Sequence, residues 1–192
     1  RLGGYNQSSF AFRPSCAAAQ SPCLVILWLK SPYLASRLLA ARARTPDNAV
    51  MTFRSHMDIA LQEATAAALR GEVPVGAVIV GPEGVVAAAG NRTRELNDPT
   101  AHAEVLAIRA ACNALGQERL TGYDLYVTLE PCPMCAAAIS NARLARLYYG
   151  AADPKSGGVA QGAKIFSHPQ CHHRPEVYDG IAAAESETLL RD

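Results

Sequence analysis

The stretch that most constrains this chain is residues 125–135, where an apolar run leads directly into two prolines and two cysteines. The apolar part, Leu125–Leu129, is typical of a buried strand. The prolines favour the start of a helix, predicted over 132–142. Cys132 and Cys135 are three positions apart and therefore fall on one face of the first helical turn. Any fold must place two thiols where a strand passes into a helix.

From Met51 onward, segments with a strand pattern and segments with a helix pattern follow one another along the chain. Helices are predicted over 56–70, 100–115, 132–142 and 175–191, and strands over 75–80, 85–89, 125–129 and 144–149. Gly81–Gly84 predicts a hairpin between the first two strands, and either Asp98 or Thr100 is expected to cap the second helix, with Gly116 after its end. This alternation predicts an α/β layered domain whose later strands are parallel.

The chain is predicted to divide into a folded domain and an N-terminal segment, residues 1–50, that lies outside its core. Residues 51–192 are predicted to form one domain, and residues 1–50 to lie outside its core as a disordered, mis-started or targeting extension. The apolar run at 23–29 is much shorter than the roughly 20 apolar residues that a membrane span needs, so no membrane association is expected.

The charge distribution does not identify a binding partner, whereas the cysteine pattern indicates the cellular compartment. Residues 1–50 carry six basic and one acidic side chain, and residues 51–192 carry twelve basic and sixteen acidic ones. The overall balance therefore gives no electrostatic support for nucleic-acid binding. Six irregularly spaced cysteines do not resemble a secreted disulfide framework, so a reducing, cytoplasmic location is expected.

Three chemistries are open to the paired thiols: a redox dithiol, a structural zinc clip and a catalytic zinc site. The upstream segment Thr-Ala-His-Ala-Glu adds His102 and Glu104, again at a helix start. If both helices begin at the same edge of the sheet, His102 joins Cys132 and Cys135 as a third ligand, leaving a fourth position for water. Glu104 is then available to move a proton. A redox pair or a structural clip has no use for Glu104, so the catalytic reading is favoured.

The pattern His-x-Glu at 102–104, followed by Pro-Cys-x-x-Cys at 131–135, resembles the signature of the zinc-dependent nucleobase deaminases. The resemblance continues over 51–192 in EVPVGAVIV, GNRTRELNDPTAHAE, LYVTLEPCPMCAAAI, YYGAADPKSGG and HPQCHHRPEV. Together these segments look like the bacterial tRNA-specific adenosine deaminases. The family's fold, which the resemblance implies here, is a three-layer α/β/α domain around a mixed five-stranded sheet.

The resemblance also implies a site and a reaction. His102, Cys132 and Cys135 would hold one zinc ion per subunit, and Glu104 would shuttle protons. Zinc-activated hydroxide would attack C6 of the wobble adenosine in a tRNA anticodon, giving inosine and ammonia. The residues that match the family's substrate-contacting positions are Asn91, Glu72, Val73 and Asp153.

The expected partner is the anticodon stem-loop of a tRNA, in particular an arginine tRNA, bound by a homodimer without an organic cofactor. Candidates for a basic RNA surface are Arg143, Arg146, Lys155, Lys164 and Arg174. Two alternatives stay open. The segment TLEPC-x-x-C also occurs in deaminases of free bases, so guanine or cytosine is a possible substrate. A zinc-stabilised binding module without catalysis is the other.

Overall fold

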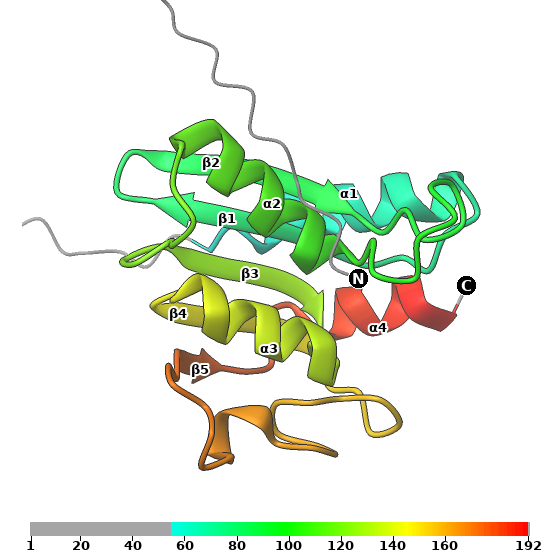
Figure 1. Cartoon of the computed structure of the whole chain (residues 1–192). Coiled ribbons are helices and arrows are strands. Elements are labelled where there is room, and N and C mark those ends of the chain that lie inside the picture. The colour runs from blue at the N-terminus through cyan, green and yellow to red at the C-terminus, as the bar shows by residue number, and fades with distance from the viewer. Residues whose placement is uncertain (1–54, 192) are drawn as a thin grey trace, which may run out of the picture. The chain divides into compact units, whose positions relative to one another are not determined.

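A computed structural model of the chain describes residues 55–191, and the expectations for residues 1–50 lie outside this range. The elements, in order, are α1 (Met57–Leu69), β1 (Gly76–Gly81), β2 (Gly84–Gly90), α2 (Ala103–Leu115), β3 (Asp124–Leu129), α3 (Pro133–Ala142), β4 (Arg146–Ala151), the short 3-10 helix η1 (Ile165–Ser167), β5 (Glu176–Tyr178) and α4 (Ala183–Arg191). Figure 1 shows their arrangement. None of the helices among these described residues has the length and apolar character that crossing a bilayer requires.

The five strands form one mixed sheet in the order β2-β1-β3-β4-β5. The hairpin β1–β2 is antiparallel, and so is the β1–β3 pair, whereas β3–β4 and β4–β5 are parallel. The predicted mixed five-stranded α/β fold with parallel later strands is therefore confirmed.

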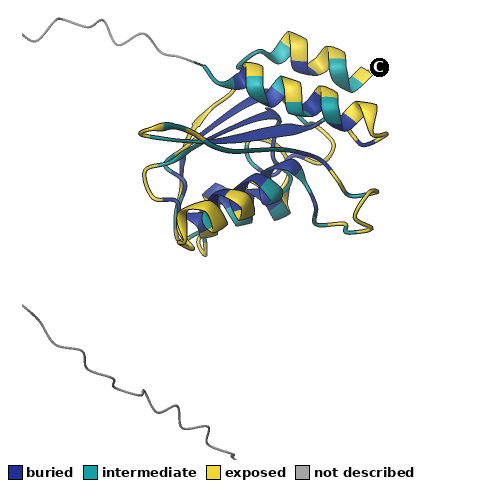
Figure 2. Ribbon diagram, turned by 90° about the horizontal axis from the view of Figure 1, so that it is seen from above, coloured by how far each residue is buried: buried dark blue, intermediate teal, exposed yellow. Residues whose placement is uncertain are grey.

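Successive side chains of the central strands point to opposite faces of the sheet and so form two hydrophobic cores, one on each face. Ala77 and Ile79 of β1 pack in the cluster that includes α2 and α3, whereas Val78 between them packs with Met57 of α1. Figure 2 shows the buried sheet between the two helical layers, whose exposed faces point outward. Tyr126 belongs to the second cluster, on the α1 side. This is the predicted three-layer arrangement.

Two predicted boundaries were wrong near the end of the chain. Residues 175–182 are not helical, because Glu176–Tyr178 adds a strand to β4 and the Tyr178 ring stacks on Tyr148 at a centroid distance of 4.9 Å. A strand this short cannot show the alternation of apolar and polar residues from which strands are predicted. The strand predicted over 144–149 begins only at Arg146, because the Leu144 N–H still bonds to the last turn of α3.

Strand direction brings the ends of several elements to one edge of the sheet. β2 and β3 both run antiparallel to β1, so they run parallel to each other. The helices α2 and α3 follow the carboxyl ends of these two strands, and residue 152 follows the carboxyl end of β4 at the same edge. The segment before β1 lies at this edge too, because β1 runs antiparallel to β2 and β3 and therefore has its amino end where they have their carboxyl ends. A site assembled from these ends is therefore shared by four segments of the chain.

Candidate active site

The helix that carries His102 begins later than its pattern predicted. The backbone N–H and the hydroxyl of Thr100 both donate to Asp98 Oδ1, so Asp98 closes a turn ahead of the helix. The N-cap of α2 is His102, and the first helical N–H, on Ala103, donates to Asn91 Oδ1 at 2.8 Å. The prediction of Asp98 or Thr100 as the cap was wrong because a side chain from another segment satisfies the helix end. The predicted stop is confirmed, since Gly116 ends α2 in the left-handed conformation.

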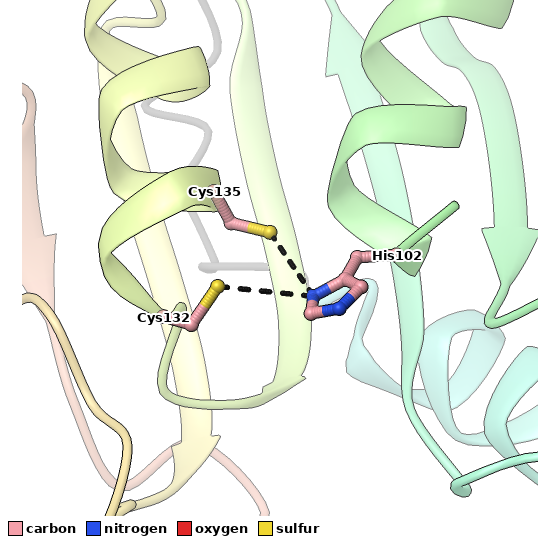
Figure 3. A group of neighbouring side chains, drawn as sticks. All are labelled: His102, Cys132 and Cys135. Carbon is pink, nitrogen blue, oxygen red and sulfur yellow. Dashed lines mark hydrogen bonds between the residues drawn. The ribbon is translucent and has the colours of Figure 1, made fainter. Parts of the chain in front are cut away.

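The second helix start carries both thiols. Cys132 is the N-cap of α3 and Cys135 lies in its first turn, with Pro133 between them as predicted. The His102 ring reaches across from α2, with its Nδ1 atom 3.5 Å from Cys135 Sγ and 3.8 Å from Cys132 Sγ (Figure 3). The structure thus brings together the three residues that the sequence pattern predicted as ligands.

The geometry of this trio fits a tetrahedral zinc ion. The ligand atoms all lie within 4.8 Å of one another, and among the described residues this is the group of three that could hold a metal. Zinc at ordinary bond lengths places a nitrogen ligand and a sulfur ligand about 3.6 Å apart in a tetrahedral site. The observed separations of 3.5 and 3.8 Å match this spacing. Two sulfurs and one imidazole nitrogen form a donor set that zinc prefers.

Hydrogen bonds among the three residues shift the pKa of each of them. The hydrogen bond from the Cys135 thiol, together with the smaller effect of the His102 ring, lowers the pKa of Cys132 to about 4. The same bond, together with burial, raises the pKa of Cys135. The Cys132 sulfur also raises the pKa of His102 by accepting a hydrogen bond from its ring. The site is therefore arranged to hold thiolate beside imidazole, and a metal ion would remove the remaining thiol proton.

Glu104 lies one position inside α2 and is only 3% exposed. Burial raises the pKa of its carboxyl group, while the nearby His102 ring acts in the opposite direction. Glu104 lines the same pocket as His102 and Cys132. A carboxyl group with a raised pKa beside a ligand trio is suited to accepting and returning a proton.

The pocket over these residues has a volume of about 180 Å³. Three of the four residues predicted to contact substrate line it: Asn91, Val73 and Asp153. Asn91 is buried, whereas Val73 is 46% exposed at the rim. Because Asn91 Oδ1 accepts the Ala103 N–H, its amide NH2 group remains available as a donor at the pocket that Asn91 lines.

Glu72, the fourth of these residues, lies outside the lining of the pocket. Its side chain is buried, and its carboxylate accepts hydrogen bonds from the hydroxyl of Thr93 and from the backbone N–H groups of Arg94 and Glu95. These bonds lower the pKa of Glu72, the Glu95 N–H most strongly. Thr93 lines the pocket, so Glu72 acts on the cavity through the loop that it holds.

The sequence pattern missed Glu130, Thr93 and Ser156, which also line the pocket. Glu130 is the most unusual of them, because its buried carboxylate accepts four backbone N–H bonds from residues 153–161. The sequence did offer one sign of it, because Glu130 is a charged residue between a buried strand and Cys132. No local pattern showed that its bonding partners come from a segment beyond α3 and β4.

The predicted basic residues are dispersed. Arg146 begins β4, at the opposite end of the sheet from the pocket, and pairs with Asp124 at 2.9 Å. Arg143 donates to the His172 carbonyl oxygen, and next to it the His173 carbonyl oxygen accepts from Ser140 of α3. Lys155 lies next to a pocket residue, because its backbone N–H donates to Asp153 Oδ1.

Comparison with known proteins agrees with this geometry. The model of the cytidine and deoxycytidylate deaminase zinc-binding region matches residues 51–151. A tRNA-specific adenosine deaminase from Agrobacterium fabrum is 63% identical over 142 residues, which cover 73% of this chain and 93% of that protein. A solved structure from work on A-to-I editing by tRNA:A34 deaminases at the wobble position is 64% identical. Its TM-score is 0.69, and the match covers 70% of this chain and 97% of that one.

A guanine deaminase from Nitrosomonas europaea shares the fold at 21% identity and a TM-score of 0.62, over 70% of this chain and 80% of that one. That likeness is informative about the fold alone. The match to the zinc-binding region covers more than half of the chain, and the Agrobacterium relative is matched over nearly its whole length. This chain therefore belongs to the zinc-dependent cytidine and deoxycytidylate deaminase family, in the group formed by the tRNA-specific adenosine deaminases.

Proposed function

We propose that this protein is a hydrolase that deaminates adenosine to inosine at the wobble position of a tRNA anticodon. The observation that carries the proposal is that His102, Cys132 and Cys135 lie together with zinc-compatible spacing, and that His102 and Cys132 share one pocket with Glu104. The Agrobacterium relative, at 63% identity, supports the substrate class. Single-stranded loops suit this chemistry, because an unstacked base can enter a pocket.

We assign His102, Cys132 and Cys135 as the ligands of one zinc ion. When bound by these three residues, zinc would lower the pKa of a water molecule and so would supply the nucleophile for attack on C6 of adenine. The two helix starts fix the ligands, because His102 and Cys132 are both N-cap residues with extended backbones. Loss of either cap would displace a ligand together with its helix end.

Glu104 is assigned as the general acid and base. Its carboxylate takes a proton from the attacking water and delivers it to the amino group that leaves as ammonia. Burial favours the protonated form between these two transfers, which is consistent with the raised pKa. Its position one place inside α2 keeps the carboxyl group beside the pocket without making it a ligand.

The proposed substrate contacts come from residues that line the pocket. The Asn91 NH2 group can donate to an acceptor on the purine, and Val73 can pack against the edge of the base. Asp153, which also lines the pocket, can accept from the ribose or from a flanking nucleotide. Glu72 contributes indirectly by holding Thr93 at the wall.

The remaining assignments rest on the family. They are an arginine tRNA as the partner, a homodimer as the working form, residues 51–192 as the catalytic domain, a cytoplasmic location and no organic cofactor. Cytoplasmic tRNA and the reduced state that two zinc-binding thiols require both support the location.

One comparison of substrates tests the proposal. The zinc-loaded protein is incubated with an arginine tRNA anticodon stem-loop and, separately, with free guanine, cytosine and adenosine, and products are identified by mass spectrometry. We expect inosine at the wobble position and no conversion of the free compounds. Deamination of guanine or cytosine with inert RNA would reassign the enzyme to free bases. No turnover on any substrate would favour a zinc-stabilised binding module.

A further inference from the structure

Glu130 has a bonding pattern that the proposed chemistry does not use. The residue follows β3 and precedes Cys132 by two positions, and its side chain is 2% exposed. Oε1 accepts the N–H groups of Val159 at 3.2 Å, Ala160 at 2.9 Å and Gln161 at 2.9 Å, and Oε2 accepts the N–H of Asp153 at 3.1 Å. Four backbone donors around one carboxylate form a strong, charge-assisted set of bonds.

The segment that supplies these donors, residues 153–161, is wrapped closely around the carboxylate. At Gly157 a Cβ atom would lie 2.6 Å from Glu130 Oε1, so any side chain there would meet the carboxyl group. At Gly158 a Cβ atom would lie 2.5 Å from the backbone nitrogen of Pro133. The Gly158 N–H also donates to the Pro131 carbonyl oxygen at 2.8 Å. Segment 153–161 therefore rests on the same turn that presents the zinc-binding thiols.

Segment 153–161 is also one wall of the pocket. Asp153 and Ser156 line the cavity together with His102 and Cys132. The Asp153 carboxylate is itself oriented by the N–H groups of Lys155 and Ser156, at 3.0 and 2.9 Å. The backbone of Asp153 is held by Glu130, so the position of this wall relative to the zinc turn depends on one buried side chain.

We propose that Glu130 is a positioning residue that sets the distance between the substrate-binding wall 153–161 and the zinc turn. The proposal rests on the proposed function, because it assigns the wall to substrate binding. Glu130 lines the pocket, but both of its oxygens already accept backbone N–H groups, so we assign it a role through Asp153 and not on the reacting atoms. Its role is expected to show in substrate affinity more than in turnover.

The test is Glu130→Gln in the full zinc-loaded protein. A glutamine keeps the size of the side chain but turns one oxygen into an NH2 group, which faces backbone N–H donors in either orientation. We expect KM for the anticodon stem-loop to rise by about tenfold or more, while kcat changes by less than about threefold and zinc content is unchanged. Glu118→Gln, at an exposed side chain away from the pocket, is the matched control and should leave both constants unaltered.

Hydrogen exchange supplies a readout that does not require activity. In the Gln variant the amides of residues 153 and 159–161 should exchange at least about tenfold faster, while those of β3 and β4 keep their protection. Equal loss of protection throughout the domain would show a purely structural role and overturn the proposal. If the variant does not fold, Gly157→Ala disturbs the same contact from the wall side and must produce the same local exchange and KM effects.

A double-mutant cycle with Asp153→Ala identifies the route of the effect. If Glu130 acts through Asp153, the KM increase caused by Glu130→Gln should be much smaller in the Asp153→Ala background. Fully additive effects would overturn the proposal. Wild-type protein that fails to deaminate the RNA would refute the proposed function, and the exchange experiment would then decide the role of Glu130 separately. Normal wild-type turnover with unchanged KM and exchange in the variant would refute only the role of Glu130.

Discussion

Asn91 and Ala103, which lie twelve positions apart in the chain, are joined by a single hydrogen bond from the Ala103 N–H to Asn91 Oδ1 at 2.8 Å. This bond does two things at once. It satisfies the first free N–H group of the helix that begins after His102, and it uses the amide oxygen of Asn91, so the NH2 group of this pocket-lining residue remains available as a donor. A proposed substrate contact and a proposed zinc ligand are thereby held by the same hydrogen bond.

The two functions of Asn91 can be separated by substitution. Asn91→Asp keeps an oxygen for the Ala103 N–H but replaces the NH2 donor by an acceptor, whereas Asn91→Ala removes both. We expect both variants to lose about tenfold or more in kcat/KM on the stem-loop, and only the Ala variant to lose thermal stability as well. Steady-state kinetics and thermal unfolding measure these effects. An Asp variant with normal kinetics would show that the amide donor does not contact substrate.

Glu104→Gln should abolish proton transfer without disturbing the metal site. The variant keeps a side chain of equal size in a buried position but has no carboxylate to accept the proton. Inosine formation should fall by at least about 100-fold with zinc content unchanged. Metal analysis and product analysis on the same sample provide the measurement, with Glu118→Gln as control. Turnover close to that of the unmodified enzyme would remove Glu104 from the mechanism.

Removal of the metal should loosen the junction between α2 and α3, because the ligand trio connects the two helix starts. We expect Cys135→Ala to lose bound zinc, and chelation of the wild type to lower Tm by about 5 °C or more. Cys171→Ser is a suitable comparison, since that thiol bonds to the His173 carbonyl oxygen outside the trio. A Cys135 variant that still binds one equivalent of zinc would contradict the ligand assignment.

The buried carboxylate of Glu72 predicts a defined pH dependence of stability. Hydrogen bonds from the loop, the Glu95 N–H first, and the charge of Arg94 lower its pKa in the folded state. The folded state then binds fewer protons than the unfolded chain, so the stabilisation is present above the ordinary carboxyl pKa and is lost as the pH falls below it. The Tm difference between wild type and Glu72→Gln should therefore be several degrees near pH 7 and shrink below about pH 4. Thermal unfolding across this range measures it, and a constant difference would contradict the lowered pKa.

Deletion of residues 1–50 should leave the enzyme active. The ligands, Glu104 and the pocket residues all lie in the part of the chain after residue 70. We expect the shortened protein to retain one zinc ion and kcat/KM within about twofold of the full chain. Zinc analysis and kinetics on the stem-loop provide the comparison. An insoluble or inactive truncation would show that the segment 1–50 belongs to the working domain.

Local pattern and family resemblance identified most elements of the fold and the central chemistry. Apolar runs and turn residues located α1, the β1–β2 hairpin and α3, because these signals depend on neighbours in the chain. Cys132 and Cys135 could be paired from spacing alone, since side chains three positions apart within one helical turn share a face. His102 and Glu104 needed the additional inference that two helices begin at one edge of the sheet.

The remaining features depend on contacts between distant segments. The start of α2 is set by Asn91, β5 exists because β4 offers it a pairing edge, and Glu72 proved to hold a loop instead of lining the cavity. Glu130 draws its four donors from residues 153–161. The sequence determines which chemical groups are present and where the spacing of apolar residues favours a helix or a strand. Their partners are fixed when packing brings chain segments together, since a buried polar group must then find whichever donor or acceptor lies within reach.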